Sequence, residues 1–381
     1  MILFIDGNQI DDQHSSINRS MIKVFELIYP NEEFSVLCEK SHYTKIVDNT
    51  ADKHSINYAS GLYIAGPNSK LKKFFSEIYN FLFIICYIIF NNPKKVVFLS
   101  LYPTSHYLYR RISNFLKPEI YVVCHGELRF IRNNTNSLLT PCGWMIKAFS
   151  FSTNKIKSKW CYIYLGEQIE IPIFMQNENI VKINLPTEFK AIPPKRKLIN
   201  KTCITLATIG VASESKMTHL FFEMAMKLKS NKKIRFIATG AVDHTIMKYK
   251  DSNVDADYSG QFLPSKEVEK RLNSADLAVF FYNDAYADVA SGAVLEAIRY
   301  EIPVLALNNK YFQFLEKNNI KFFKCFENID EMEEFILSDG YYDINCDFSS
   351  AKKLYSIEAA AKILNASIHN LHSENSNKSY G

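Results

Sequence analysis

The side chains best placed for chemistry in this sequence are two carboxylates separated by seven residues. Asp288 lies just before a turn of small residues, and Glu296 lies two helical turns further on, within the stretch 275–307. The turn consists of Ser291, Gly292 and Ala293. Small residues ahead of a helix leave backbone N–H groups free at its positive end, where phosphate or a sugar hydroxyl can bind. Carboxylates in a cleft accept paired hydrogen bonds from neighbouring hydroxyls, so the stretch predicts a site for a sugar or a ribose.

Other polar residues follow apolar runs that have the length of strands. Gly210 ends the run 204–210 and Lys216 follows it, and both are candidates to contact phosphate. His125 follows the run 120–124 and is a candidate to contact a sugar. His14, in the polar loop after the first run, is a weaker candidate to contact an acceptor. Structural interpretations stay open beside these. A strand end can hold a hydrogen-bonded histidine, Lys216 can be a solvated side chain, and Asp288, Ser291 and Gly292 can simply begin a helix.

Short apolar runs alternate with helical patterns along the chain. The first half has strand candidates at 2–5, 34–38, 62–65, 96–100, 120–124 and 162–165, with helical patterns near 16–29, 70–90, 104–116 and 140–149. The second half has strand candidates at 204–210, 234–240, 276–282, 303–307 and 321–326, with helical patterns near 216–229, 264–274, 292–300, 309–318, 328–338 and 350–371. Apolar strands between helices indicate parallel sheets covered on both faces, so we expect an α/β fold of two doubly wound, Rossmann-like domains that face each other across a cleft.

A proline-rich segment divides the chain. Residues 184–201 contain three prolines and a basic cluster and lack an apolar period, which is typical of a linker. We therefore expect an N-terminal domain over 1–185, a linker over 186–201 and a C-terminal domain over 202–348. A final helix over 349–372 is expected to cross back to the N-terminal domain, ahead of a polar tail over 373–381.

The stretch that contains Asp288 and Glu296 resembles the donor-site signature of retaining GT-B glycosyltransferases. This large family includes bacterial mannosyltransferases, sucrose synthase and many capsule and O-antigen enzymes. Its pattern is a Glu, seven residues, a second Glu, an Ala and a strand that contains Pro, and this chain has Asp288, Glu296, Ala297 and Pro303 in those places. In the family the first acid holds hydroxyls of the donor sugar and the second holds the ribose. The chain departs from the family in having Asp for the first Glu, which leaves room for a different donor sugar.

Three further segments resemble the same family. Residues 204–228 are similar to its strand ending in Gly, cationic loop and long helix, with Gly210 and Lys216 in place and Val211 where the family has Arg. Residues 258–280 resemble its glycine-containing loop, short helix and Ala-Asp strand. The resemblance places the nucleotide base near Gln261, Phe262 and Leu263. His125 resembles the histidine that faces the donor sugar.

The resemblance implies a glycosyltransferase with the donor in the C-terminal domain and the acceptor in the N-terminal domain. A sugar would pass from a UDP-sugar, favoured over a GDP-sugar, to a hydroxyl of a glycan or lipid-linked acceptor, with retention and in bacterial surface-polysaccharide synthesis. Lys216 and the amides of residues 291–293 would stabilise the departing diphosphate, and His125 and Asp288 would act at the sugar. Two alternatives remain: a nucleotide-sugar 2-epimerase on the same fold, and a non-catalytic protein that binds a sugar nucleotide or a partner.

Charge and missing motifs exclude several other classes. The net charge of +5 comes from residues 1–190, which have 21 Lys and Arg against 16 Asp and Glu, while the remainder has 24 against 24. This excess is small and includes no basic run interleaved with aromatic residues, so we expect no nucleic-acid partner. The dinucleotide, P-loop and zinc-hydrolase motifs are absent from the sequence. Asp255 and Asp257 form a D-x-D, but they lie just before Gly260 in the second half, and we expect no metal or other cofactor.

The cellular location is predicted from the first residues and one apolar segment. The start, MILFIDGNQ, has neither a basic region nor a cleavage site, and the eight cysteines form no C-x-x-C pair, so we expect a cytoplasmic protein. Residues 74–90 are strongly apolar and flanked by lysines, but their uninterrupted run over 81–90 is shorter than the ~20 residues of a spanning helix. The segment fits a buried helix or a helix with one face on the inner membrane surface, and both interpretations stay open.

Overall fold

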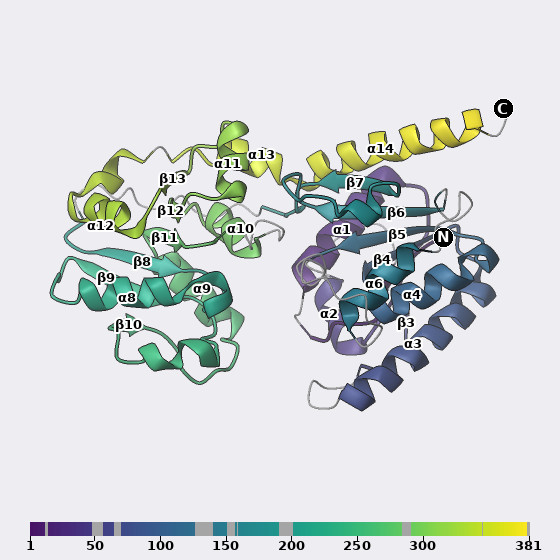
Figure 1. The fold of residues 1–381 in the computed structure, drawn as a ribbon, viewed down its shortest axis with the longest axis horizontal. Coiled ribbons are helices and arrows are strands. Elements are labelled where there is room, and N and C mark those ends of the chain that lie inside the picture. Colours follow the sequence, from purple (N-terminus) through teal and green to yellow (C-terminus); the bar gives the residue numbers. More distant parts are fainter. Residues whose placement is uncertain are drawn as a thin grey trace. The chain divides into compact units, whose positions relative to one another are not determined.

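The computed structural model describes residues 1–11, 14–47, 56–64, 70–125, 140–150, 157, 159–189, 201–283, 291–344 and 346–378. They form two compact units, each built on one parallel sheet (Figure 1). Unit 1 contains Met1–Glu188 and Tyr355–Gly381, and unit 2 contains Phe189–Leu354. The predicted α/β class with two parallel sheets is confirmed.

The sheet of unit 1 has seven strands in the order β3-β2-β1-β4-β5-β6-β7. The strands are β1 Ile2–Asp6, β2 Phe34–Cys38, β3 Asn57–Ala59, β4 Lys95–Ser100, β5 Glu119–Cys124, β6 Trp160–Leu165 and β7 Asn179–Ile183. The helices are α1 Ser15–Ile28, α2 Lys40–Ile46, α3 Lys70–Asn91, α4 Pro103–Ile112, α6 Pro141–Phe149 and α14 Ile357–Lys378, with short 3-10 turns η1 Ser113–Phe115 and η2 Ile173–Met175. Strands β1, β2, β4, β5 and β6 are almost wholly buried because helices cover both faces. The strand order reverses between β1 and β4, which is where ligands bind in open parallel sheets.

The sheet of unit 2 has six strands in the order β10-β9-β8-β11-β12-β13, and its order reverses between β8 and β11. The strands are β8 Ile204–Thr208, β9 Ile234–Ala238, β10 Val254–Asp255, β11 Leu277–Phe280, β12 Val304–Leu307 and β13 Phe323–Phe326. The helices are α8 His219–Lys227, α9 Ser265–Ser274, α10 Gly292–Arg299, α11 Lys310–Lys317, α12 Ile329–Leu337 and α13 Ser349–Leu354, with 3-10 turns η3 Glu214–Lys216, η4 His244–Tyr249 and η6 Gly340–Asp343.

The chain passes from unit 1 to unit 2 after Glu188 and returns to unit 1 at Tyr355. The two connecting segments are hydrogen-bonded to each other. The amide of Thr187 donates a hydrogen bond to the Tyr355 carbonyl at 2.8 Å, and Thr187 forms an isolated parallel bridge with Ser356. Helix α14 then packs against α1 and β7 through Ala360, Leu364 and Ile368. The expected single helix over 349–372 is therefore wrong, because Tyr355 and Ser356 interrupt it: α13 belongs to unit 2 and α14 to unit 1. The helix also continues to Lys378, beyond the expected start of the tail, since residues 373–378 include no Pro or Gly.

Three local predictions differ from the structure. The strand expected at 62–65 is absent from its described part, 62–64, because the Asn80 amide side chain bonds both the Tyr63 N–H and C=O, each at 2.9 Å, and takes the place of a strand partner. Strand β3 lies instead at Asn57–Ala59. Strand β7 was not expected, since its polar residues break the apolar run. The helix expected from Lys216 begins at His219, because Met217 adopts a left-handed conformation with φ 55°.

Candidate functional site

In unit 2, the loop after β8 brings Gly210 close to two predicted donor-site residues. Gly210 has φ +79°, a conformation that favours glycine. A Cβ built on it would lie 3.5 Å from the Lys216 Nζ and 3.6 Å from the Ala293 Cβ. Gly240, which follows the neighbouring strand β9, packs closely against Gly210, since a Cβ built on Gly240 would lie 2.5 Å from the Gly210 carbonyl oxygen. The Gly210 backbone at this strand end therefore lies close to a lysine ammonium and to the start of α10.

Helix α10 begins beside that loop with a side-chain cap. The Ser291 Oγ accepts a hydrogen bond from the Val294 amide at 3.3 Å and lies 2.9 Å from the Tyr282 hydroxyl. Ser291 is buried, and its side chain is used within the fold. Apart from its chain neighbours and the backbone of its own helix, no described residue lies within 4 Å of a Cβ built on Gly292, at the first position of the helix. The first-turn amides and the positive end of the helix dipole suit an anion here.

Glu296 lies one turn into α10, with about a third of its side chain exposed and an ion pair to the Arg299 Nη1 at 2.8 Å. Burial raises the pKa of its carboxyl, although Arg299 acts in the opposite direction. A partly buried carboxylate on the helix that starts beside Gly210 is placed to accept hydrogen bonds from hydroxyls. Asp288, the other predicted acid, lies outside the described residues.

The predicted base-contacting residues lie in the loop between β10 and α9. The Gln261 amide donates to the Ser259 Oγ at 3.2 Å, the Phe262 ring is 80% exposed and Leu263 is half-buried. Gly260, with φ +74°, makes the turn. An exposed phenyl ring after a glycine turn can stack on a planar base, although no described residue covers it here.

Asp255 and Asp257 each have protein partners. Asp255 pairs with Arg235 and with Arg271, the latter at 3.2 Å, and Asp257 accepts from the Ser259 amide at 2.8 Å. Within the described ranges, no group of three His, Cys, Asp or Glu side chains could hold a metal ion. Asp255 of the D-x-D therefore belongs to an ion-pair cluster, and Asp257 stabilises the loop that follows it.

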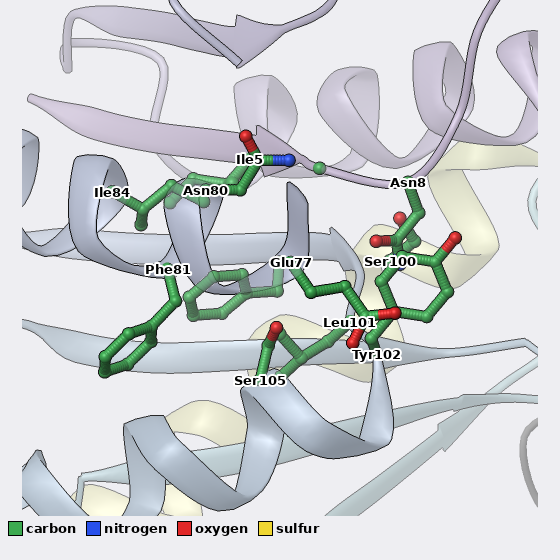
Figure 2. Close-up of a pocket in the computed structure, with 12 residues that line it drawn as sticks. Ile5, Asn8, Glu77, Asn80, Phe81, Ile84, Ser100, Leu101, Tyr102 and Ser105 are labelled. Carbon is green, nitrogen blue, oxygen red and sulfur yellow. The ribbon is translucent and has the colours of Figure 1, made fainter. Parts of the chain in front are cut away.

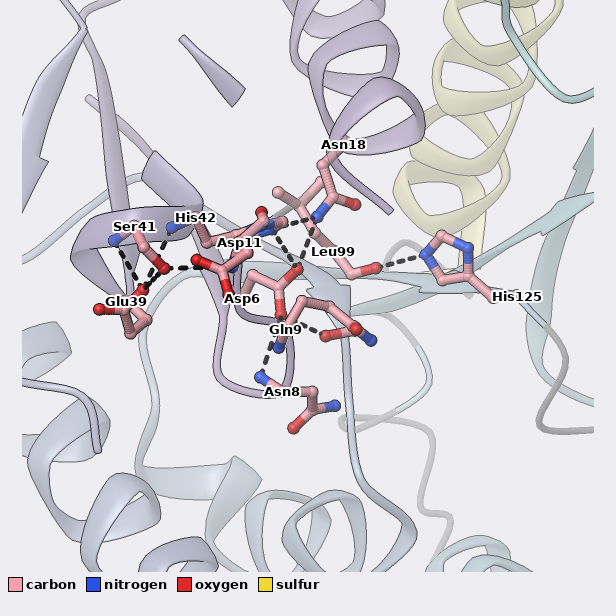
Figure 3. Close-up of polar contacts among 11 residues, drawn as sticks. Asp6, Asn8, Gln9, Asp11, Asn18, Glu39, Ser41, His42, Leu99 and His125 are labelled. Carbon is pink, nitrogen blue, oxygen red and sulfur yellow. Dashed lines mark hydrogen bonds and ion pairs between the residues drawn. The ribbon is translucent and has the colours of Figure 1, made fainter. Parts of the chain in front are cut away.

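In unit 1, a buried polar network that sequence analysis missed surrounds Asp6, the last residue of β1 (Figure 3). The Asp6 Oδ1 accepts from the amides of Asn8 at 3.0 Å and Gln9 at 3.1 Å and from the Ser100 hydroxyl at 2.6 Å. Its Oδ2 accepts from the Asn18 Nδ2 at 2.6 Å. Full burial alone would raise the pKa of this carboxyl, but the hydrogen bonds from His42 and Ser100 lower it below the ordinary value. Asp6 is therefore a buried carboxylate.

His42 completes the network from α2. Its Nε2 lies 3.3 Å from the Asp6 Oδ2 and 3.0 Å from the Asn18 Nδ2, and its Nδ1 lies 2.7 Å from the Asp11 carbonyl. Because a carbonyl only accepts, the Nδ1 carries a proton. Burial lowers the pKa of His42, but the hydrogen bonds with Asp6 and the Asp11 carbonyl and the charges of Asp6 and Glu39 together outweigh burial, so the pKa is raised.

Together these contacts fix the loop that leads from β1 to α1. Four backbone groups of the loop are held: the Asn8 and Gln9 amides by Asp6, the Asp11 carbonyl by His42 and the Asp11 amide by the Ser41 hydroxyl at 3.1 Å. Glu39 caps α2 by accepting from the Ser41 and His42 amides. The described part of the loop up to Asp11 is thereby held in place.

The two predicted histidines of unit 1 lie against each other. The His14 and His125 rings meet edge to face, with centroids 5.0 Å apart. The His125 Nε2 lies 2.7 Å from the Leu99 carbonyl, so it carries a proton and the neutral ring offers Nδ1 as an acceptor (Figure 3). Burial lowers the pKa of His125, despite the hydrogen bond to Leu99 and the charge of Asp6. The ring therefore stays neutral at pH 7.

A narrow pocket opens beside this loop, between the ends of β1 and β4 and the helices α3 and α4 (Figure 2). Its polar lining comprises Asn8, Glu77, Asn80, Ser100, Tyr102 and Ser105. Burial raises the pKa of the Glu77 carboxyl, more than Lys73 and a hydrogen bond with Thr104 lower it. In the sequence, Glu77 is only a polar residue within the apolar segment 74–90. Its position in a pocket depends on how α3 packs against α4.

Comparison with known proteins identifies the architecture. Sucrose-phosphate synthase from Thermosynechococcus elongatus has a TM-score of 0.65 at 13% identity, covering 98% of this chain and 100% of its own. The HepE protein of Anabaena, in complex with UDP-glucose, has a TM-score of 0.59 at 10% identity, covering 98% and 99%. The chain has the GT-B fold. A protein from Listeria monocytogenes assigned as a UDP-N-acetylglucosamine 2-epimerase shares it, with a TM-score of 0.59 at 12% identity, covering 98% and 97%. No protein-family model and no curated protein sequence matches the chain.

Within this fold, the structure brings together some of the predicted residues. Gly210, Lys216 and Ala293 meet at the strand-order reversal of unit 2, and the helix carrying Glu296 starts there. His14 and His125 meet at the carboxyl end of the sheet of unit 1. Asp6 had one sequence signal that could have been used: a carboxylate directly at the end of the first buried strand, a position like that of His125.

Proposed function

We propose that this protein is a glycosyltransferase that moves a sugar from a nucleotide-sugar donor to a hydroxyl of a glycan or lipid-linked acceptor. The observation that carries the proposal is the arrangement at Gly210, where the backbone lies close to the Lys216 ammonium and the start of α10. The GT-B fold of glycosyltransferases of known structure supports it. We further propose a UDP-sugar as donor, since HepE binds UDP-glucose in this fold.

The proposed reaction breaks the bond between the anomeric carbon and the diphosphate oxygen and forms a bond to the acceptor oxygen. Negative charge then develops on the diphosphate, and the Lys216 ammonium and the α10 amides lie where they can stabilise it. One well-placed donor of this kind typically lowers a barrier by about 3 kcal/mol. Because Lys216 and these amides stabilise the charge, we propose that the reaction needs no metal. The acceptor proton passes to the departing diphosphate, so no protein nucleophile is needed, and we propose retention of configuration with Asp288 and His125 at the sugar.

His125 is proposed to accept a hydrogen bond from a sugar hydroxyl through Nδ1, because Nε2 is engaged with Leu99. Glu296 is proposed to hold the ribose, and Gln261, Phe262 and Leu263 to contact the base. His14 and the pocket that contains Glu77 are proposed to contact the acceptor. We propose a cytoplasmic protein of bacterial surface-polysaccharide synthesis that works beside the inner membrane.

A thermal-shift panel with UDP, GDP, CMP and their sugars, with and without EDTA, tests the donor site. A ligand at a hundred times its dissociation constant stabilises the folded protein by about 2.7 kcal/mol. We expect a shift with UDP and UDP-sugars that is insensitive to EDTA and lost in Glu296→Ala and Lys216→Ala. The matched control is Glu316→Ala, which removes an exposed carboxylate from α11. No shift with any nucleotide would refute the proposal.

The epimerase match supports a second candidate, a 2-epimerase that uses the same donor without an acceptor. Incubation with UDP-N-acetylglucosamine followed by NMR distinguishes the two, because only an epimerase interconverts the sugar in the absence of acceptor. Nucleotide binding without turnover of any donor would instead favour the non-catalytic alternative, which Val211 in place of the family's arginine keeps open.

A further inference from the structure

Helix α3 presents an apolar stripe to solvent. Its exposed members are spaced four, three, four and three residues apart, which keeps them on one face of the helix. They are Phe75, Tyr79, Leu82, Cys86 and Ile89, followed by Phe90. Phe75, Leu82 and Ile89 are 57–64% exposed and Phe90 is 85% exposed. From Phe75 to Ile89 the helix rises by fourteen residue steps, or about 21 Å along its axis.

The opposite face of α3 is buried although part of it is polar. Ser76, Asn80, Ile84 and Ile88 face the interior, and Asn80 is committed to the backbone of Tyr63. A surface helix ordinarily shows the reverse pattern, with polar residues outward. A continuous exposed apolar stripe of this kind marks a surface that something else covers.

The charged residues around the stripe indicate what kind of surface covers it. Lys72 and Lys73 are exposed at its start, and Lys94, with a side chain 68% exposed, follows its end. The only acidic residue on the helix is Glu77, which lines the pocket on the inner side. Lys94 pairs with Glu32 at 2.6 Å, but α3 itself carries no exposed carboxylate. Apolar side chains bordered by lysines suit the interface of an anionic lipid bilayer.

A second element extends this surface. Phe115 is 85% exposed at the end of η1, and Lys117 is exposed beside it. Strands β4 and β5 start at the same edge of the sheet, because Lys95 and Glu119 are register partners and the Glu119 amide donates to the Lys94 carbonyl at 3.1 Å. Phe115 therefore lies at the same edge of the sheet as Phe90.

We propose that the stripe on α3 docks unit 1 onto an anionic bilayer surface, with the helix parallel to the membrane. Among the described helices, α3 is long and apolar enough to span a membrane, but the same helix packs Ile84 and Ile88 into the core of the sheet. A surface contact keeps that packing and covers the stripe. This contact stands independently of the transferase assignment. If the proposed function holds, the docked helix also places the pocket lined by Glu77 within reach of a lipid-linked acceptor.

Vesicle binding by the full chain tests the proposal. We expect co-sedimentation with phosphatidylcholine–phosphatidylglycerol vesicles, weaker binding to phosphatidylcholine alone and weakening with added salt. The triple variant Phe75→Gln, Leu82→Gln and Ile89→Gln should lower the partition coefficient at least ~10-fold, since three apolar side chains no longer enter the interface. A matched control makes the same change at three exposed apolar residues elsewhere, Leu27, Ile173 and Leu337, and should bind like the wild type.

Cys86 supplies a local measurement because it lies within the stripe, while Cys203 and Cys346 are exposed in unit 2. Thiol alkylation followed by mass spectrometry should show Cys86 protected by anionic vesicles and the other two thiols unchanged. Equal rates at Cys86 with and without vesicles would refute docking through α3. Protein that resists an alkaline carbonate wash would indicate a spanning helix, and a dimer without lipid that the triple variant dissociates would identify a second copy as the occupant; either result overturns the proposal. The nucleotide panel does not depend on any of these outcomes.

Discussion

Replacement of Asp6 by asparagine should strongly destabilise unit 1. The side chain keeps its size but loses its charge, and one carboxylate oxygen becomes an NH2 group. In one orientation this group meets the Asn18 Nδ2 and His42 Nε2, and in the other it meets the Asn8 and Gln9 amides and the Ser100 hydroxyl. At least two hydrogen bonds to a charged acceptor are lost, each worth about 1.5–3 kcal/mol. His42 or Ser100 can recover part of this by accepting from the new NH2, so we expect a loss of about 3 kcal/mol.

Tryptophan fluorescence measures this effect in one unit, because both tryptophans, Trp144 and Trp160, belong to unit 1. Urea unfolding followed by this signal should show a midpoint about 1 M or more below the wild type, for m-values of about 1–3 kcal/mol/M. Hydrogen exchange at the Asn8 and Gln9 amides should accelerate in parallel. Asp11→Asn is the matched control, since the Asp11 side chain is exposed and only its backbone joins the network.

The stability difference between wild type and Asp6→Asn should also depend on pH in a defined direction. Because the pKa of Asp6 is lowered in the folded protein, its contribution is present above the unfolded value near 4 and is lost as pH falls through the folded value. The difference between wild type and Asp6→Asn should therefore shrink in acid. It should also fall as pH rises above about 6.5, because Asp6 contributes to the raised pKa of His42 and that contribution is lost as His42 deprotonates. A change within about 0.5 kcal/mol, which is usual for an exposed site, would refute the assignment of Asp6 as the centre of the network.

Other variants test the remaining buried contacts. Gly240→Ala should destabilise unit 2 by about 2 kcal/mol and weaken the nucleotide shift, since its Cβ would overlap the Gly210 carbonyl, whereas Gly292→Ala should change calorimetric stability by less than ~0.5 kcal/mol. Arg110→Met should lower the free energy of unfolding by about 3–5 kcal/mol, measured by urea unfolding followed by tryptophan fluorescence. The buried Glu178 carboxylate then lacks its paired hydrogen bonds at 2.9 and 3.0 Å. Recovery of stability in the Arg110→Met, Glu178→Met double variant would confirm this cause. Because the folded pKa of His42 is raised, the wild type should lose stability as pH rises above about 6.5, and this loss should be absent in His42→Gln. Because the folded pKa of His125 is lowered, the wild type should lose stability as pH falls below about 6.5, and this loss should be absent in His125→Gln. Tryptophan-detected unfolding across that range checks both signs, and identical pH profiles for the two variants would contradict them.

The sequence predicted the strands well because buried parallel strands are short, apolar and separated by helices. The bounds expected for 34–38 agree with β2, and the residues expected to contact phosphate lie together in unit 2. Gly210 could be found because it closely follows β8, and Ala293 because it belongs to a turn of small residues at a helix start. The carboxyl ends of parallel strands share one edge of a sheet, which brings such residues together.

The contacts of unit 1 were harder to predict because they depend on tertiary packing. Asp6, Asn18 and His42 come from β1, α1 and α2, and no local pattern states that these elements meet around one carboxylate. Glu77 interrupts an apolar helix, and only the packing of α3 against α4 reveals its pocket. The failed strand at 62–65 has the same origin, since the long-range bond from Asn80 competes with local strand propensity.

The double crossing between the units has a consequence for synthesis on the ribosome. Unit 2 is one continuous segment, but unit 1 needs both the first 188 residues and α14, which is made last. The N-terminal sheet emerges first and must wait, with α1 and β7 uncovered, until all of unit 2 has been translated. A chain that stops at residue 354 would contain a complete unit 2 attached to an unfinished unit 1, so truncation near the C-terminus should damage the domain that contains the N-terminus.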